Sequence, residues 1–262
     1  MTTSNAEVTS VRDLYDAVAD EYDQITRHND YDEWVGLYAG LIERHGAPGE
    51  RLLDIGAGTG QASIRLAEAG FAVTAVDISA EMLRQARAKP GADAVQFVVT
   101  DLRELPDLGT FDVAVALGEP FVYLVGETEL AAALRGVARL LAAGGLLIFD
   151  LVTAGFCRRY RTYVAVDETA DRVTVIRGAE PRQDPRGADY LLDQFTTDDG
   201  VTWRRTSQRH SFSYFAPETV DRLLREAGLE PLAVHGLQRG ELQETADDEA
   251  HRKRFVVARR PA

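Results

Sequence analysis

Short apolar stretches alternate with amphipathic helical segments between residues 51 and 151, and this rhythm constrains the fold more than any other feature of the chain. Strands are expected at residues 51–55, 71–77, 95–99, 111–117 and 145–151. Helices are expected between them, one after Gly60 that ends at Gly70, one at 79–89 and one at 128–143. Continuous apolar strands separated by helices are typical of a parallel sheet covered on both faces. We therefore expect an α/β protein with a doubly wound sheet.

Two further helices are predicted before the first strand. Apolar residues recur on one helical face along residues 11–25, and Ser10 and Asp13 have the spacing of a capping box. A second amphipathic helix runs from about residue 32 to 45, and Gly46 ends it. A helical segment therefore precedes the α/β core.

The alternation stops after Asp150. Between about residues 158 and 215, β-rich runs follow one another with Asp, Gly and Pro turns between them, which predicts an inserted antiparallel sheet. A helix that opens at Pro217 and two final strands then complete the core. The expected organisation is a helical cover at 1–48, an α/β core at 49–155, a β-rich insertion at 156–215 and a C-terminal helix and hairpin at 216–262.

The net charge of −13 makes nucleic acid a poor candidate partner, because the chain and a phosphate backbone repel each other. Cys157 is the one cysteine, so no intramolecular disulfide can form, and no Cys/His cluster has zinc-ligand spacing. No stretch approaches the roughly 20 apolar residues that span a bilayer, and the first ten residues lack the basic start of a signal peptide. We expect a cytoplasmic protein without a membrane partner.

The sequence LLDIGAGTG, from Leu52 to Gly60, places a glycine-rich turn directly after the first core strand. Glycines let a ligand approach the backbone, because no Cβ obstructs it. The next strand ends in Asp77, whose carboxylate can accept hydrogen bonds from ribose hydroxyls. The dinucleotide fingerprint G-x-G-x-x-G would need its third glycine at Gln61, so the turn predicts a nucleotide-like ligand other than NAD.

The successive segments LLDIGAGTG, FAVTAVDIS, VVTDLRELP, FDVAVALGEPF and LLAAGGLLIFD resemble, in order, the motifs of class I S-adenosylmethionine-dependent methyltransferases. The resemblance covers about residues 50–150. It implies the family's Rossmann-like, seven-stranded doubly wound sheet with the last strand antiparallel, here with an inserted antiparallel β-rich lid. It also implies S-adenosylmethionine as the cofactor.

The resemblance assigns the glycine turn to the methionine part of the cofactor. Gly56, Ala57, Gly58 and Gly60 match the loop that lies under it, and Asp54 matches the residue that orients the loop and the cofactor's amino group.

The resemblance assigns the next two strand ends to the adenosine part. Asp77 matches the ribose-binding acid, and Ile78 and Met82 match residues that pack on the adenine. Asp101 matches the residue that reaches the adenine amine, helped by the Leu102 backbone.

The N-terminal sequence YDAVADEYDQI resembles a pattern of small-molecule members, including the amino-sugar and lincosamide-type N-methyltransferases of antibiotic pathways. In those enzymes this helix closes over the cofactor, and tyrosines that match Tyr15 and Tyr22 face the active site. Tyr15 fits this role and a core position equally, whereas the functional role is favoured for Tyr22. Trp34 fits a core position or the wall beside the sulfonium, and the core is favoured.

The end of the fourth strand and the segment GEPFVYL at residues 118–124 bear on the acceptor. Leu117 matches the residue whose carbonyl meets the cofactor's amino group. Enzymes that methylate exocyclic amines of nucleic acids carry Asn/Asp-Pro-Pro-Tyr/Phe here, where this chain has Glu-Pro-Phe. Metal-dependent catechol O-methyltransferases have an acid at the end of strand four and an Asp-Asn pair after strand five, but here strand four ends Ala-Leu-Gly and Leu151 follows Asp150. We therefore expect no metal.

Phe121 and Tyr123 are the candidates for contact with the acceptor. In the amino-sugar enzymes that this chain resembles, a histidine near the acceptor amine occupies the position of Tyr123. A phenol with a pKa near 10 is a poor base at neutral pH, so we expect Tyr123 to orient the amine by a hydrogen bond. Glu119 either attracts a cationic amine or is a solvated loop charge, and His210 in the insertion is a weaker candidate.

The leading hypothesis is therefore methyl transfer to an amine nitrogen of a small molecule, in antibiotic or other secondary metabolism. The alternatives are a small-molecule O-methyltransferase and a cofactor-binding protein without turnover, which the intact glycine turn and Asp77 disfavour. The β-rich insertion is expected to set acceptor specificity, and a homo-oligomer formed through it is left open.

Overall fold

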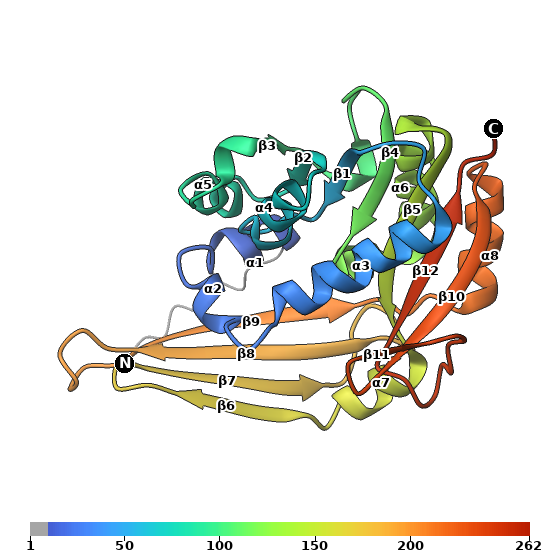
Figure 1. Cartoon of the computed structure of the whole chain (residues 1–262). Coiled ribbons are helices and arrows are strands. Elements are labelled where there is room, and N and C mark those ends of the chain that lie inside the picture. Colours follow the sequence, from blue (N-terminus) through green and yellow to red (C-terminus); the bar gives the residue numbers. More distant parts are fainter. Residues whose placement is uncertain (1–9) are drawn as a thin grey trace.

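The structure is a computed structural model that describes residues 10–262, and it contains two β-sheets (Figure 1). The strand order of the larger, eight-stranded sheet is β11 (Glu241–Gln243), β10 (Glu230–Gln238), β12 (Lys253–Arg259), β5 (Leu141–Val152), β4 (Phe111–Ala116), β1 (Arg51–Ile55), β2 (Ala72–Asp77) and β3 (Val95–Val99). The strands from β3 to β5 pair in parallel, whereas β12 is antiparallel to β5. The expected sheet with an antiparallel last strand is confirmed, and the short strand β11 extends it.

Helices cover both faces of this sheet. They are α3 (Tyr31–His45), α4 (Gln61–Glu68), α5 (Ala80–Arg87), α6 (Gly126–Leu140) and α8 (Pro217–Glu226). Helices α3 and α4 pack together, and Tyr38 of α3 shares a core cluster with Leu52. Helices α6 and α8 pack together in another cluster, which joins Leu134 to Leu53. Because side chains alternate along a strand, the neighbouring residues Leu52 and Leu53 of β1 pack into the cores on opposite faces of the sheet.

The second sheet, called here the lid sheet, is antiparallel in the order β6 (Val164–Glu168), β7 (Arg172–Ala179), β8 (Ala188–Thr196) and β9 (Arg204–Phe212). Helix α7 (Ala154–Tyr160) connects it to β5. Tyr190 of β8 pairs in register with His210 of β9. The antiparallel sheet predicted from the β-rich runs is confirmed, and Figure 1 shows it extending beside the N-terminal helices.

The predicted helix over residues 11–25 is broken into α1 (Val11–Asp16) and α2 (Tyr22–Ile25), which together form the cover segment. The predicted cap is present, because Ser10 Oγ accepts a hydrogen bond from the Asp13 N–H at 3.1 Å. Around the break, acidic side chains of the segment accept hydrogen bonds from the core on one side and from the lid sheet on the other. Tertiary contacts here override the helical periodicity.

The cover segment bridges the core and the lid sheet. On the core side, Ser79 donates to Asp16 at 2.5 Å, and Thr59 of the glycine turn donates to Asp23 at 2.5 Å. On the lid side, Gln194 donates to Glu21 at 2.9 Å. The segment therefore closes the space between the two sheets through polar contacts. Across residues 10–262, no helix combines the length and apolarity that a membrane span requires.

Candidate active site

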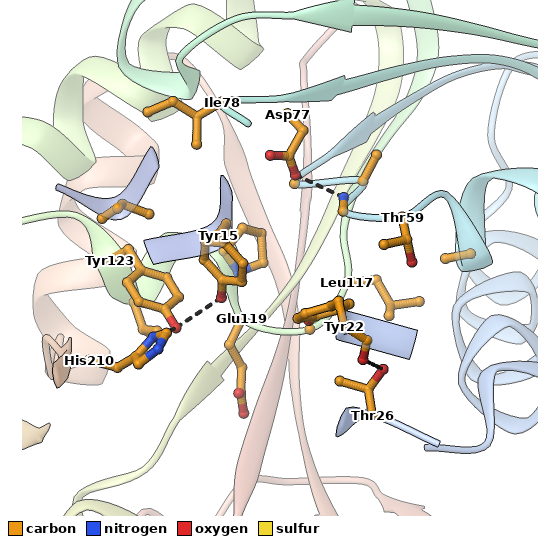
Figure 2. A pocket seen from close by; sticks show the side chains of 18 of the residues that line it. Tyr15, Tyr22, Thr26, Thr59, Asp77, Ile78, Leu117, Glu119, Tyr123 and His210 are labelled. Carbon is orange, nitrogen blue, oxygen red and sulfur yellow. Dashed lines mark hydrogen bonds between the residues drawn. The ribbon is translucent and has the colours of Figure 1, made fainter. Parts of the chain in front are cut away.

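A cavity of about 310 Å³ lies where the carboxyl ends of β1, β2 and β4 face the cover segment and the lid sheet (Figure 2). Ligands of open α/β sheets bind at such strand ends. Most of the residues predicted from the sequence line this cavity: Tyr15, Tyr22, Asp54, Gly56, Ala57, Gly58, Asp77, Ile78, Asp101, Leu102, Leu117 and Tyr123.

Three predicted site residues lie behind the cavity wall, which corrects their expected placement. Phe121 is fully buried, because the 3₁₀ turn η3 (Pro120–Tyr123) directs its ring onto Phe149 at a centroid distance of 5.0 Å. Met82 is also fully buried and packs under the cover segment. A Cβ at Gly60 would lie 2.8 Å from the Cβ of Ala86, so this glycine permits close packing of α5.

The glycine turn combines a rigid frame with one open position. The N–H groups of Gly56 and Ala57 donate to the Val76 carbonyl at 2.9 and 3.0 Å, which fixes the turn to the end of β2. Gly58 has φ +54° and no atom within 4 Å of where its Cβ would be. Because Gly58 also lines the cavity, its backbone can be approached closely by a ligand.

Two carboxylates flank the turn, the partly buried Asp77 and the buried Asp54. Asp77 accepts hydrogen bonds from the N–H groups of Gly58 and Ser79, each at 2.8 Å. Burial raises the pKa of Asp77, although these N–H groups oppose the change. Asp54 accepts a hydrogen bond from Ser63 Oγ at 2.6 Å, and burial raises the pKa of Asp54 to about 6.

Asp101 and Leu102 lie beside the Asp77 end of the cavity, at the 3₁₀ turn η2 (Leu102–Glu104). The Asp101 carboxylate accepts from the Arg103 N–H at 2.9 Å and pairs with the Arg103 guanidinium at 2.5 Å. Burial alone would raise the pKa of Asp101, but the Arg103 contacts outweigh it and the pKa is lowered. Asp101 is therefore ionised at neutral pH.

The opposite wall is a chain of hydrogen bonds between aromatic side chains. Tyr15 donates to the Tyr123 hydroxyl at 2.9 Å, and Tyr123 lies 3.1 Å from His210 Nδ1 (dashed lines in Figure 2). Tyr190 stacks on His210 at a centroid distance of 4.5 Å, and the Phe212 ring contacts Tyr123 edge-on at 5.4 Å. Burial lowers the pKa of His210 to about 3, so the imidazole is neutral.

A buried charge cluster forms a third part of the wall. Lys253 Nζ donates to Asp150 at 2.8 Å, lies 3.2 Å from a Glu119 carboxylate oxygen, and sits 4.7 Å from the centroid of the Trp34 ring. Burial lowers the pKa of Lys253, but Asp150 and Glu119 outweigh it and the pKa is raised. Trp34, for which the core was favoured, lines the cavity.

Sequence patterns gave His210 little weight and did not identify Lys253, Tyr190 or Phe212. All of them come from the lid sheet or the last strand, far along the chain from the glycine turn. Sequence alternation places His210 and Phe212 on one face of a strand, but it does not show which face meets the cavity. Within the described range of the chain, no group of three or more His, Cys, Asp or Glu side chains could hold a metal ion.

Comparisons with known proteins agree with this geometry. Residues 52–145 match a family model described as a methyltransferase domain. The cypemycin N-terminal methyltransferase of Streptomyces sp is 31% identical over 219 residues, which cover 79% of this chain and 83% of that protein.

Solved structures show the same fold. An S-adenosylmethionine-dependent methyltransferase from Clostridium acetobutylicum ATCC 824 has a TM-score of 0.79 at 18% identity, covering 95% of this chain and 100% of the other. The sugar N-methyltransferase KedS8 from Streptoalloteichus sp ATCC 53650 has a TM-score of 0.76 at 22% identity, covering 100% and 97%. The glycine turn, the strand order and the relatives together show that the chain belongs to the class I S-adenosylmethionine-dependent methyltransferases. S-adenosylmethionine is the methyl donor of these enzymes.

Proposed function

We propose that the protein methylates an amine nitrogen of a small molecule. The observation that carries this proposal is the neutral wall formed by Tyr15, Tyr123 and His210 opposite the glycine turn. When bound, S-adenosylmethionine would supply a methyl group on a sulfonium, and a lone pair of the acceptor would bond to that carbon in line as the C–S bond breaks. The residues of the wall therefore need to orient a nucleophile, and orientation alone can contribute about 7–11 kcal/mol.

The glycine turn and Asp77 would hold the cofactor. The open side of Gly58 admits the methionine part against the backbone. Each Asp77 oxygen accepts one backbone N–H and keeps a lone pair for a ribose hydroxyl. Ile78 and Asp101 line the same cavity and would meet the adenine.

The protonation states of the wall favour nitrogen over oxygen as the acceptor. His210 has a pKa of about 3, and burial raises the pKa of both Tyr15 and Tyr123. None of these three groups takes a proton from an alcohol at neutral pH. An amine needs no such base, because a fraction of it is always unprotonated in water, whereas a hydroxyl acceptor requires one.

Two relatives support nitrogen methylation in secondary metabolism. The cypemycin enzyme is named as an N-terminal methyltransferase, and KedS8 is named as a sugar N-methyltransferase. The cavity of about 310 Å³ includes the residues assigned to the cofactor, so only part of it is open to the acceptor. We propose a small-molecule acceptor and, because of the net charge of −13, no nucleic acid.

A labelled methyl donor, offered with a panel of amines, alcohols, phenols and carboxylic acids, tests the proposal. Mass spectrometry and NMR of the products identify the methylated atom. We expect products methylated on nitrogen, with kcat/KM rising with pH as the fraction of free amine increases. A methyl group found on oxygen would replace this function by that of an O-methyltransferase.

A further inference from the structure

Glu119 has a backbone conformation that side chains rarely adopt. It follows Gly118 at the end of β4, and its φ is +68°, in the left-handed region that favours glycine. Glutamate is not among the residues enriched there, and strained residues of this kind concentrate at functional sites. In Figure 2 the Glu119 side chain lies between His210 and Tyr22, within the cavity.

The surroundings hold this side chain in place without neutralising it. The Glu119 N–H donates to Asp150 at 2.8 Å, and Lys253 lies between the Asp150 and Glu119 carboxylates. One ammonium faces two carboxylates, so these three groups together carry a net negative charge, while the guanidinium of Arg252, which also lines the cavity, lies over the Phe156 ring. Lys253 and Asp150 are 5% and 2% exposed at their side chains, whereas Glu119 is 13% exposed and lines the cavity. The uncompensated charge therefore meets the ligand space at Glu119.

The field of Glu119 reaches the wall that would hold the acceptor. Burial is the main cause that raises the pKa of Tyr15 and of Tyr190, and the Glu119 charge raises both further. In a partly buried site such a charge acts with little screening by solvent. A cation placed among these rings would be attracted by Glu119.

We propose that Glu119 binds the positive charge of the methyl acceptor, so that the enzyme selects amines that are ammonium ions in solution. The inference rests on the proposed function and names its substrate class: aliphatic amines in preference to aryl amines, amides or alcohols. The ammonium gives one proton to water, its lone pair forms the N–C bond while the C–S bond breaks with its electrons on sulfur, and the methylated nitrogen is again cationic. Glu119 therefore faces a cation before and after transfer, and its loss should raise KM far more than it lowers kcat.

A pair of ring compounds that differ in one group measures the preference directly. Cyclohexylamine and cyclohexanol are titrated by NMR into the protein saturated with S-adenosylhomocysteine at pH 7. We expect the ammonium to bind at least ten-fold more tightly than the alcohol. In Glu119→Gln the preference should fall below three-fold, and Glu119→Asp should restore part of it. Wild-type protein without a preference for the ammonium, including no binding of it, overturns the proposal.

Two controls separate this proposal from a loss of folding and from the proposed function. Glu226→Gln on α8 removes the same charge from an exposed pair with Arg222, and it should leave the preference unchanged. The affinity for S-adenosylhomocysteine should be the same in all variants, because Glu119 is assigned to the acceptor. If the products carry their methyl on oxygen while the charge preference holds, nitrogen methylation fails and the cation site stands. If the products are methylated on nitrogen but no charge preference is found, nitrogen methylation stands and the cation site fails.

Discussion

Replacing Asp54 by Asn is expected to stabilise the free protein at neutral pH. The side chain of Asp54 is buried, with 1% of the residue exposed, and burial raises its pKa from the ordinary 3.8 to about 6. Between these two values the folded state holds a proton that the unfolded state has lost. Stability therefore falls as pH rises through this window, and the full penalty applies above pH 6. The difference corresponds to on the order of 3 kcal/mol, which Asn avoids because it has no charge.

Urea unfolding of both proteins at two pH values measures this effect. The variant should exceed the wild type by about 3 kcal/mol at pH 7.5 and by about 1 kcal/mol at pH 4.5. Asp112→Asn is the matched control on the neighbouring strand β4, since the Arg51 guanidinium lowers the pKa of Asp112. A carboxylate whose pKa is lowered by folding stabilises the folded state at pH values above its ordinary pKa. That stabilisation is lost as the pH falls through the lowered pKa. The control should therefore be less stable than wild type by nearly the same amount at pH 7.5 and at pH 4.5, because both values lie above the ordinary pKa of 3.8.

Two outcomes would refute this reasoning. A variant no more stable than wild type at pH 7.5 would show that the Asp54 carboxylate is well solvated in the cavity. An equal gain at both pH values would assign the effect to packing rather than to charge. If Asp54 orients the glycine turn toward the cofactor, the stabilised variant should also bind S-adenosylmethionine more weakly by calorimetry.

Three further predictions follow from the same cavity. Tyr123→Phe should lower kcat/KM about 10-fold, as expected for one lost hydrogen bond of about 1–1.5 kcal/mol; a loss of 10²-fold or more, with a missing limb in the pH profile, would make Tyr123 a base. Asp77→Ala should weaken S-adenosylmethionine binding by about 1–3 kcal/mol in calorimetry, because ribose hydroxyls lose a charged acceptor, and unchanged affinity would remove Asp77 from the site. Cofactor binding should slow hydrogen exchange across residues 10–36, where the polar contacts of the cover segment close the cavity; protection confined to the Gly56 turn would show that the segment is fixed packing.

The sequence predicted those parts of the site whose positions follow from their place next to a strand in the chain. The glycine turn follows β1 and Asp77 is the last residue of β2, and parallel strands bring their carboxyl ends to one edge, so the spacing alone placed them together. Tyr15 and Tyr22 were assigned from the resemblance, and both line the cavity.

The positions of the other site residues depend on tertiary contacts, which the spacing of residues along the sequence does not reveal. Phe121 and Tyr123 are two residues apart, but the η3 turn buries Phe121 and leaves Tyr123 on the wall. His210 reaches Tyr123 only because β9 pairs with β8 at the register that the lid sheet adopts. Lys253 meets Asp150, which lies 103 positions earlier in the chain, because β12 is antiparallel to β5.

The central claim is that one cavity binds the methyl donor with its sulfur facing the wall of Tyr15, Tyr123 and His210, beside Glu119. A crystal structure of the protein with S-adenosylhomocysteine tests this most directly. The account predicts ribose hydroxyls within hydrogen-bonding distance of Asp77, the amino-acid part along the Gly58 backbone, and the sulfur facing Tyr123 and Glu119 across an open space. A ligand whose sulfur faces away from these side chains, or whose ribose does not contact Asp77, would contradict it.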